Sequence, residues 1–561
     1  MRIKVILVYI FKSLPWKPQQ IIKLLITIFR ETSYPHSDFP LIGKKQFFSI
    51  RSSHLDKAMK FNNDEFEYYS KIYNDPRVID TDLTEIDVSR TSIEILPGRL
   101  LKNYKSSVKN SSIFQISKVN PSAINIKIKK KNNEDIFNLS IKSNRFISFF
   151  EESGTNIEIK SKENFFVSMP AAIDQKIKHK KKMVLLLFVD GLVDRSVLGH
   201  DNLEDIMPYT AKFFQGGFDF RNHYVNSEWT LPSFASIFSG QYTQTHGLFD
   251  PHKIEELGKS FNILSQYFKY DQYSTLSIGG NPRISPSHGY VKGFDRSIYR
   301  SFMPAQEVIS NFLEHNLVFN KRDQFCFLQF NDLHHNLPVV PDFSVMSSLH
   351  SKDLASAFNP IAKNIKSVWS SKNNDKKKVF IERIRRLDSH LNIIYKYLND
   401  NYEASDISVC LTGDHGQSYL SDDAHPLSMA RTKAIWLFKS GDKKGSNVME
   451  HTEGVDIFNT ILSDAEINFD HNIDGKLPRA FGGESERDFS FAQSIYPGQT
   501  YKAVINSDHG RYTYETKIPV ANNGVINHKN PTIIINQNNN TKNYFTEEQV
   551  KNIVINKIKR V

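Results

Sequence analysis

A threonine placed ahead of a proline-led apolar run carries the strongest chemical signal in the chain. Residues 230–233 read Thr-Leu-Pro-Ser and lead into an apolar stretch that ends at Gly240. Proline suits the first turn of a helix, where its missing N–H has no partner in any case. We therefore predict that Thr230 sits just before a helix N-terminus, where unpaired amides favour an anion. This setting suits a hydroxyl nucleophile that attacks a phosphate-like group, and an ordinary N-cap threonine stays open as the alternative.

Two further segments each end in groups that can bind a metal. Residues 182–189 form an apolar run, typical of a buried parallel strand that delivers Asp190 at its C-terminal end. Residues 406–413 repeat this arrangement and are followed by Asp414 and His415. Ligand sites of open α/β sheets lie at these strand ends. Together with Thr230, these oxygen and imidazole groups predict a site for one divalent cation.

This combination of motifs resembles the sulfatase-like branch of the alkaline phosphatase superfamily. The resemblance runs from about residue 182 to residue 516, more than half of the chain. Its further motifs are the first crossover helix (207–218), the nucleophile loop with the segment after it (229–233 and 239–247), the central histidine segment (327–338), the helix before the Asp-His-Gly strand (383–398) and the C-terminal subdomain (493–502).

The resemblance assigns Asp190, Thr230, Asp414 and His415 to the first metal site of the family. Thr230 falls where true sulfatases carry the Cys or Ser that becomes formylglycine. Threonine cannot undergo that conversion, and Phe234 replaces the arginine that completes the sulfatase motif. The usual Asp pair is also replaced, by Asp190 and a glycine. Threonine here is the pattern of relatives that form a phosphothreonine, namely phosphodiesterases, phosphomutases and transferases of phosphoethanolamine or phosphoglycerol.

The residue types suggest a mechanism. A metal bound to the Thr230 hydroxyl lowers its pKa and shields the charge of an incoming phosphate or phosphonate ester. In-line attack then gives a covalent phosphothreonine, which water or an acceptor alcohol releases. We expect one or two divalent ions, with Zn²⁺ or Mn²⁺ favoured over Ca²⁺ or Mg²⁺.

A second group of residues matches family positions for a second metal or for histidines that grip the substrate and protonate the leaving group. It comprises Asp332, His334, His335 and His425. Neighbouring side chains on a strand point in opposite directions, so one of His334 and His335 faces the site. The family alignment favours His334 as catalytic, and pairing of Asp332 with His335 is also feasible. His425 is the other catalytic candidate, with a plain loop histidine before Pro426 as its alternative.

The predicted fold is α/β, an alkaline-phosphatase-like central and mostly parallel sheet flanked by helices. Residues 123–129 and 155–160 alternate apolar and polar side chains, which indicates half-buried antiparallel strands. We therefore predict an N-terminal β-rich accessory domain, and from the resemblance a small C-terminal α+β subdomain. The predicted segments are 1–84 (helical or irregular), 85–175 (accessory β), 182–485 (catalytic) and 486–561 (C-terminal).

Composition fits a globular protein without a nucleic-acid partner. The 561 residues carry a net charge of +11 that is spread over lysine-rich loops. The basic run 176–182 is predicted to be a solvated linker, or a patch that attracts anions. Cys326 and Cys410 lie in apolar runs and are predicted as core residues. Residues 279–282 are predicted to form a turn without chemistry.

The N-terminal apolar segments are too short to span a bilayer. Residues 1–12 and 21–30 are brief or interrupted, and no small-residue cleavage site follows the first. Family members that use lipid donors on the outer face usually carry several transmembrane helices. We therefore expect a cytoplasmic protein, with peripheral membrane contact through the N-terminus as an open alternative.

These residues lead to one favoured function and two alternatives. The first is a metal-dependent hydrolase or transferase of phosphate or phosphonate esters, acting on a small phosphate ester, a glycan or a lipid-linked precursor. The alternatives are a sulfuric ester hydrolase without formylglycine, or a catalytically silent relative that binds a glycan or protein partner. All four ligand types at the first site favour the enzyme, because a silent scaffold needs none of them.

Overall fold

The chain forms two compact units. Unit 1 comprises Met1–Asp174 and Arg296–Ser301, and unit 2 comprises Gln175–Asp295 and Phe302–Val561. The finer division predicted at residues 84 and 485 stays a prediction. The computed structural model describes residues 47–49, 59–61, 64–73, 92–118, 124–129, 134–139, 146–173, 178–253, 255–258, 260–334, 371–470, 472–537 and 545–558.

Unit 2 is built on a central, mostly parallel sheet. β17 runs antiparallel to its neighbours β16 and β12, and the other neighbouring strands are parallel. Across the sheet the described strands follow the order β13 (Ser274–Gly279), β15 (Gln324–Phe330), β11 (Met183–Val189), β16 (Ile407–Gly413), β17 (Trp436–Ser440), β12 (Phe218–Tyr224) and β18 (Asn447–Glu453).

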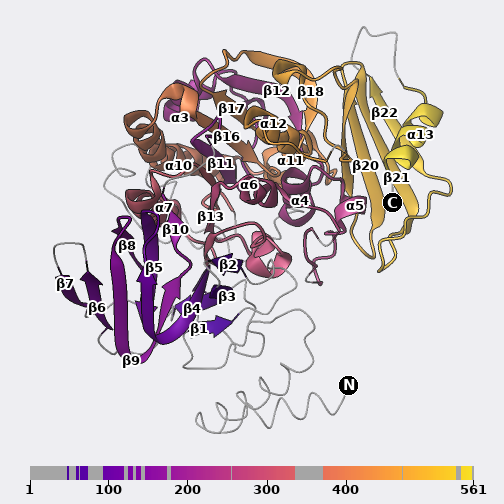
Figure 1. Ribbon diagram of the computed structural model, residues 1–561. Helices are drawn as coiled ribbons and strands as arrows, with labels where there is room; N and C mark the ends of the chain where they lie inside the picture. The colour runs from indigo at the N-terminus through magenta and orange to yellow at the C-terminus, as the bar shows by residue number, and fades with distance from the viewer. Residues whose placement is uncertain are drawn as a thin grey trace, which may run out of the picture. The chain divides into compact units, whose positions relative to one another are not determined.

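Helices cover this sheet, and the middle strands are apolar for that reason. Every residue of β11, β15 and β16 is buried, as expected for strands covered on both faces. In Figure 1, α3, α7 and α10 lie on one side of these strands and α4, α6 and α12 on the other. This arrangement confirms the predicted fold class. The helix bounds are α3 (Pro208–Phe214), α4 (Thr230–Ser239), α5 (Thr243–His246), α6 (Leu264–Tyr270), α7 (Ala305–Phe319), α10 (Asn374–Asn401), α11 (Met429–Thr432) and α12 (Asp456–Asp464).

A small antiparallel sheet with one helix follows the catalytic core, as predicted. Buried and partly exposed residues alternate along the first part of β21, and α13 buries Val550 and Val554 against this sheet. The elements are β19 (Phe489–Ser494), β20 (Thr500–Ser507), β21 (Gly510–Pro519), β22 (Thr532–Gln537) and α13 (Glu547–Ile558), seen in yellow tones in Figure 1.

Unit 1 is an antiparallel β structure. Its long strand β4 pairs with β3, β9 and β14, and β9 also pairs with β5 and β6. The two alternating segments of the sequence are β6 and the first part of β9, which confirms them as strands. The bounds are β1 (Phe47–Ser49), β2 (Met59–Phe61), β3 (Asp64–Tyr73), β4 (Ser92–Ser107), β5 (Ser112–Lys118), β6 (Ile124–Lys129), β7 (Glu134–Leu139), β8 (Ile147–Glu151), β9 (Asn156–Ser168), β10 (Ala171–Ala172) and β14 (Arg296–Arg300).

The basic run before β11 differs from the predicted solvated linker. Lys181 is fully buried and its Nζ pairs with Asp442, while Lys182 Nζ lies 2.6 Å from Asp406 Oδ2. Carboxylates beside the ends of neighbouring strands therefore neutralise much of this charge. Both cysteines are buried and free, as predicted. Among the described residues no helix is both long and apolar enough to cross a membrane, and residues 1–12 and 21–30 lie outside that part of the chain.

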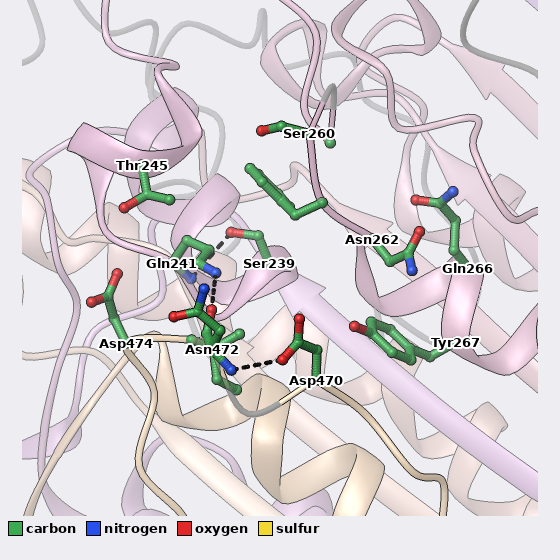
Figure 2. A pocket seen from close by; sticks show the side chains of 13 residues that line it. Ser239, Gln241, Thr245, Ser260, Asn262, Gln266, Tyr267, Asp470, Asn472 and Asp474 are labelled. Atoms are coloured by element: carbon green, nitrogen blue, oxygen red, sulfur yellow. Dashed lines mark hydrogen bonds between the residues drawn. The ribbon is translucent and has the colours of Figure 1, made fainter. Parts of the chain in front are cut away.

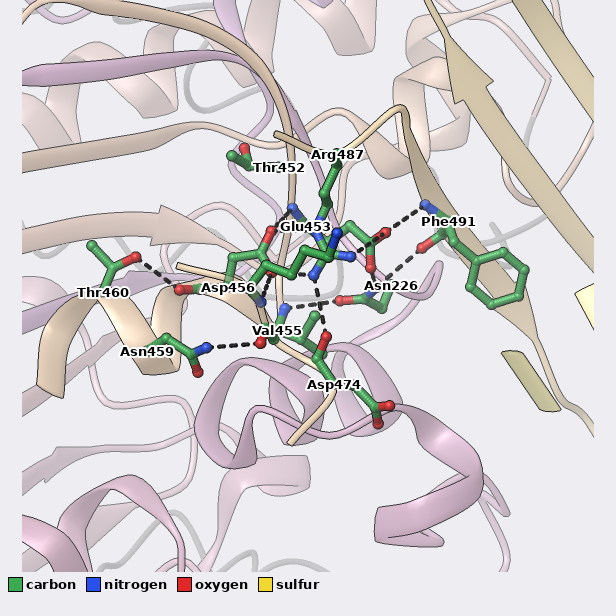
Figure 3. Close-up of polar contacts among 12 residues, drawn as sticks. Asn226, Thr452, Glu453, Val455, Asp456, Asn459, Thr460, Asp474, Arg487 and Phe491 are labelled. Carbon is green, nitrogen blue, oxygen red and sulfur yellow. Dashed lines mark hydrogen bonds and ion pairs between the residues drawn. The ribbon is translucent and has the colours of Figure 1, made fainter. Parts of the chain in front are cut away.

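A buried charge network ties the edge strand β18 to the C-terminal sheet (Figure 3). Arg487 donates from Nε to Asp456 Oδ2 at 2.9 Å and lies 3.4 Å from Glu453 Oε1. Glu453 also accepts from the Asn226 amide at 3.0 Å and from the Phe491 N–H at 3.1 Å. The carboxylates of Glu453 and Asp456 are almost wholly buried, and the guanidinium, with Lys557 acting on both as well, offsets their charges.

Arg487→Met is therefore expected to destabilise the protein by about 3–5 kcal/mol, because it leaves two buried carboxylates without the cation that contacts them directly. The matched control is Arg479→Met, which removes an exposed arginine 3.1 Å from Glu486 and is expected to cost less than about 1 kcal/mol. Urea unfolding of both variants measures the difference. Equal midpoints for the two variants would contradict a stabilising role for the network.

Candidate active site

The central sheet and α4 bring the four predicted first-site residues together. Asp190 follows β11 and Asp414 follows β16, and these strands pair in parallel with Val189 opposite Gly413. The two acids therefore leave the sheet side by side. Thr230 is the first residue of α4, after Trp229 in an extended conformation. The helix thus begins one residue earlier than predicted, and Thr230 belongs to its first turn.

The distances within this group are short. His415 Nε2 lies 3.2 Å from Thr230 Oγ1, 3.4 Å from Asp414 Oδ2 and 3.7 Å from Asp190 Oδ1. The ligating atoms of the two acids and the histidine all lie within 4.8 Å of one another. We refer to these four residues as the Thr230 cluster.

Each acid of the cluster keeps one oxygen without a hydrogen bond. Asp190 Oδ2 accepts from the Asn281 amide at 2.6 Å, and Asp414 Oδ1 accepts from the Gly191 N–H at 3.0 Å. The other oxygens, Asp190 Oδ1 and Asp414 Oδ2, are buried and unpartnered, and both face His415 Nε2. Buried carboxylate oxygens without a partner are costly, and a cation between them removes that cost. The residues present therefore fit a divalent metal ion.

Electrostatics also fit metal binding. Burial, together with the neighbouring Asp414, raises the pKa of Asp190 well above its ordinary value, and burial raises the pKa of Asp414 to about 6. Burial lowers the pKa of His415 to about 3, so this ring is neutral at pH 7. Its Nδ1–H donates to the Gly416 carbonyl at 2.9 Å, which leaves the lone pair of Nε2 for the cluster.

Comparison with known proteins gives the family. The sulfatase family model matches residues 182–467, just over half of the chain. The chain belongs to the sulfatase family. This confirms the predicted membership of the sulfatase-like branch of the alkaline phosphatase superfamily. Members are metal-dependent hydrolases, and Asp190, Asp414 and His415 form the group that can hold the metal in this member.

Solved structures with a similar fold include two phosphonate monoester hydrolases. The one from Silicibacter pomeroyi is 16% identical, with 59% of this chain and 86% of that chain covered and a TM-score of 0.44. The one from Agrobacterium radiobacter is 16% identical, with 63% and 88% covered and a TM-score of 0.45. A putative sulfatase from Bacteroides thetaiotaomicron is 14% identical, with 61% and 84% covered and a TM-score of 0.47. No curated protein matches the chain.

In this sulfatase-family protein, His334 is the member of the predicted second group that comes near the Thr230 cluster. Burial lowers its pKa to about 4, and His415 and Asp414 are near enough to act on its titration as well. Asp332 accepts from the Ala305 N–H at 3.3 Å, and its other carboxylate oxygen is buried without a partner. Within the described residues no second group of metal-binding side chains forms, and His335 lies outside them. A second metal stays a prediction.

His425 makes its hydrogen bonds within its own loop. Its Nδ1 accepts from the Leu427 N–H at 3.2 Å. Burial lowers its pKa to about 4, and the charges that act on it belong to Arg511, Asp423 and residues of the C-terminal sheet. Among the contacts of the described residues, none joins His425 to the Thr230 cluster. Its catalytic role stays a prediction.

Two side chains that belong to the site were not predicted from the sequence. Asn281 lies in the segment predicted as a plain turn, yet it holds Asp190; its place just after β13 was the signal that could have identified it. Arg431 is fully buried, donates to the Gly416 carbonyl at 2.9 Å and also donates to the Glu228 carbonyl. It therefore fastens the nucleophile segment to the Asp-His-Gly loop. Nothing in its local sequence indicates this role.

Proposed function

We propose that this enzyme hydrolyses or transfers phosphate or phosphonate esters through a covalent phosphothreonine at Thr230. The supporting observation is that the Thr230 hydroxyl lies 3.2 Å from a neutral imidazole nitrogen, beside two unpartnered carboxylate oxygens. Asp190, Thr230, Asp414 and His415 hold one divalent cation in this proposal, with Zn²⁺ or Mn²⁺ favoured by the mixed imidazole and carboxylate ligands.

The chemistry proceeds in two displacements. A divalent cation, when bound, supplies the positive charge that lowers the pKa of the threonine hydroxyl. Thr230 Oγ1 gives its proton to solvent and attacks phosphorus, the bond to the leaving oxygen breaks, and that oxygen takes up a proton to leave as the alcohol; a phosphothreonine forms, or its phosphonyl equivalent from a phosphonate ester. Water or an acceptor alcohol then attacks phosphorus and regenerates the hydroxyl. Both acceptors enter the same position, so the proposal covers a hydrolase and a transferase.

The first turn of α4 supports this attack. Helix N-termini present unpaired amides and a positive partial charge, which stabilise phosphoryl oxygens in a preorganised position. Thr230 lies in this turn, so the nucleophile and the anion-binding amides come from one element. His334, buried and close enough to be influenced by the charge of Asp414, is the side chain that we assign to contact with the substrate.

The choice of phosphorus over sulfur rests on two residues. Threonine is a secondary alcohol, so its oxidation cannot yield the aldehyde of formylglycine. Phe234, at the position of the sulfatase arginine, is fully buried, and its ring centroid lies 4.4 Å from that of Phe188 and 5.2 Å from that of Phe327. An apolar contact in the core therefore occupies the place of a charged group.

Turnover of four p-nitrophenyl esters tests the proposal. We expect the phosphate monoester, the phosphate diester or the phenylphosphonate to exceed the sulfate in kcat/KM by at least about 100-fold, because no formylglycine can form. Each assay uses protein reconstituted with Mn²⁺ or Zn²⁺, and Thr230→Ala serves as the blank. Sulfate hydrolysis that matches or exceeds the phosphorus esters would overturn the proposal.

A further inference from the structure

A large polar cavity opens at the far end of the nucleophile helix (Figure 2). Its volume is about 1100 Å³, slightly above the usual range for small-molecule sites. Its walls come from the end of α4, the loop before α6, α6 itself and the loop after α12. The side chains used below are Gln241, Phe261, Asn262, Gln266, Tyr267, Asp470, Asn472 and Asp474.

The cavity is separate from the Thr230 cluster. Ser239 lines the cavity and is the last residue of α4, whereas Thr230 is its first. Ten helical residues span about 15 Å, so the two sites lie at opposite ends of one helix. They share no described residue.

The described lining is polar and acidic. Amide, hydroxyl and carboxylate groups dominate it. Asp470 and Asp474 give it negative charge. This negative charge favours a neutral ligand over an anionic one, and hydroxyl groups suit the lining, since amides donate and accept hydrogen bonds and carboxylates accept them.

The lining is also not arranged as a metal site. Asp470 Oδ1 accepts from the Asn472 N–H at 3.0 Å, and Asp474 Oδ2 accepts from the Tyr242 N–H at 2.8 Å. In Figure 2 the two carboxylates lie on opposite sides of Asn472. Among the described residues no third acid or histidine joins them in a metal-binding group.

Several polar groups of the lining are fixed in place. Gln241 Nε2 donates to the Asn472 carbonyl at 2.9 Å, which orients the amide plane. Gln266 Oε1 accepts from the Ile263 N–H at 3.1 Å, and its amide donates to the Tyr270 hydroxyl at 3.2 Å. Preorganised amides of this kind bind a ligand with little loss of side-chain entropy.

Two aromatic rings complete the cavity. Tyr267 packs edge-on against Phe458, with ring centroids 5.7 Å apart. Phe261 packs against the hydrophobic core cluster that includes Phe458. Both rings are only partly buried, so each presents apolar surface to the cavity. Aromatic faces beside amides and carboxylates suit a ligand with one apolar C–H face and many hydroxyl groups.

We propose that this cavity binds a neutral oligosaccharide, at a site distinct from the Thr230 cluster. The proposal goes beyond the phosphoryl chemistry and does not depend on it. The hydroxyl groups of the sugar bond to the amides of Gln241 and Asn262 and to the carboxylate of Asp470, and its C–H face lies on Tyr267.

Isothermal titration of the full-length protein with neutral trisaccharides tests this proposal. The probes are maltotriose, cellotriose, mannotriose, xylotriose and N-acetylchitotriose. We expect at least one to bind with a Kd below about 1 mM. Binding is expected to be unchanged by excess EDTA and by inorganic phosphate. Loss of binding in EDTA, competition by phosphate, or no binding of any probe up to about 10 mM would overturn the proposal.

Variants at exposed positions locate the binding site. Asn262→Ala and Asp470→Ala are each expected to weaken the trisaccharide at least about tenfold. Asn523→Ala, a matched exposed asparagine outside the cavity, is expected to leave the affinity unchanged. All three are expected to keep wild-type turnover of small aryl esters. Unchanged affinity in both cavity variants would overturn the assignment, and this result is independent of any outcome at Thr230.

Discussion

Replacing Thr230 by alanine is expected to abolish turnover while the metal stays bound. The hydroxyl lost is the proposed nucleophile, and loss of a nucleophile lowers kcat by about 10³- to 10⁶-fold in comparable cases. Asp190, Asp414 and His415 remain, and their ligating atoms lie within 4.8 Å of one another without the threonine. Metal analysis and steady-state kinetics on the same sample therefore separate loss of chemistry from loss of metal.

Thr230→Ser is the matched variant, because it keeps the oxygen and removes one methyl group. We expect it to retain activity within about tenfold of wild type, since a methyl group is worth about 1 kcal/mol. Mass spectrometry of a quenched reaction is expected to find phosphate on the peptide that contains residue 230. Turnover by Thr230→Ala, or an unmodified peptide during steady-state hydrolysis, would defeat the mechanism.

The residues of the Thr230 cluster could be predicted because each follows a strong local signal. Asp190 and Asp414 come directly after apolar runs, and parallel strands place their C-terminal ends at one edge of a sheet. The register of β11 and β16 then makes the two acids neighbours. The predicted start of α4 differs from the observed start by one residue. This boundary depends on the backbone angles of Trp229 rather than on residue type.

The remaining features depend on contacts between distant segments. Arg431 donates hydrogen bonds to backbone carbonyls, which every residue carries, so no residue type in the sequence identifies its partners. The burial of Lys181 likewise depends on Asp442, which lies 261 positions away. Asp414 and His415 act on the titration of His334, whereas the contacts of His425 lie in its own loop, so the catalytic role of His425 stays a prediction.

Removing one carboxylate of the cluster is expected to release the metal without harming the fold. Asp190→Asn and Asp414→Asn keep the shape of the side chain and remove a charge that faces a second carboxylate. We expect metal affinity to fall by more than about 100-fold in each variant, with activity falling in parallel. In excess chelator, both variants are expected to be at least as stable as wild type, because burial and mutual repulsion disfavour the two charges in the metal-free fold.

Asp388→Asn is the matched control for this experiment. Burial also raises the pKa of Asp388 to about 6, but its oxygens accept from the N–H groups of Tyr209 and Thr210 at 2.9 and 2.8 Å. The amide replaces one acceptor with a donor, so we expect this variant to lose stability and to keep its metal. Wild-type metal content in Asp190→Asn and Asp414→Asn would remove these acids from the proposed site.

The raised pKa values also fix the sign of the pH dependence. Without metal, the folded protein holds protons on Asp190 and Asp414 more tightly than the unfolded chain does, so its stability falls as pH rises through about 4 to 6 and beyond. Metal binding requires both carboxylates without protons, so it releases protons and strengthens over the same range. The metal-loaded protein melts at a higher temperature than the chelated protein, and this difference in melting temperature is therefore expected to increase from pH 5 to pH 7. In Asp388→Asn the same pH dependence of this difference should persist, whereas in Asp414→Asn it should largely disappear. A wild-type difference in melting temperature that does not change with pH would contradict a metal held by Asp190 and Asp414.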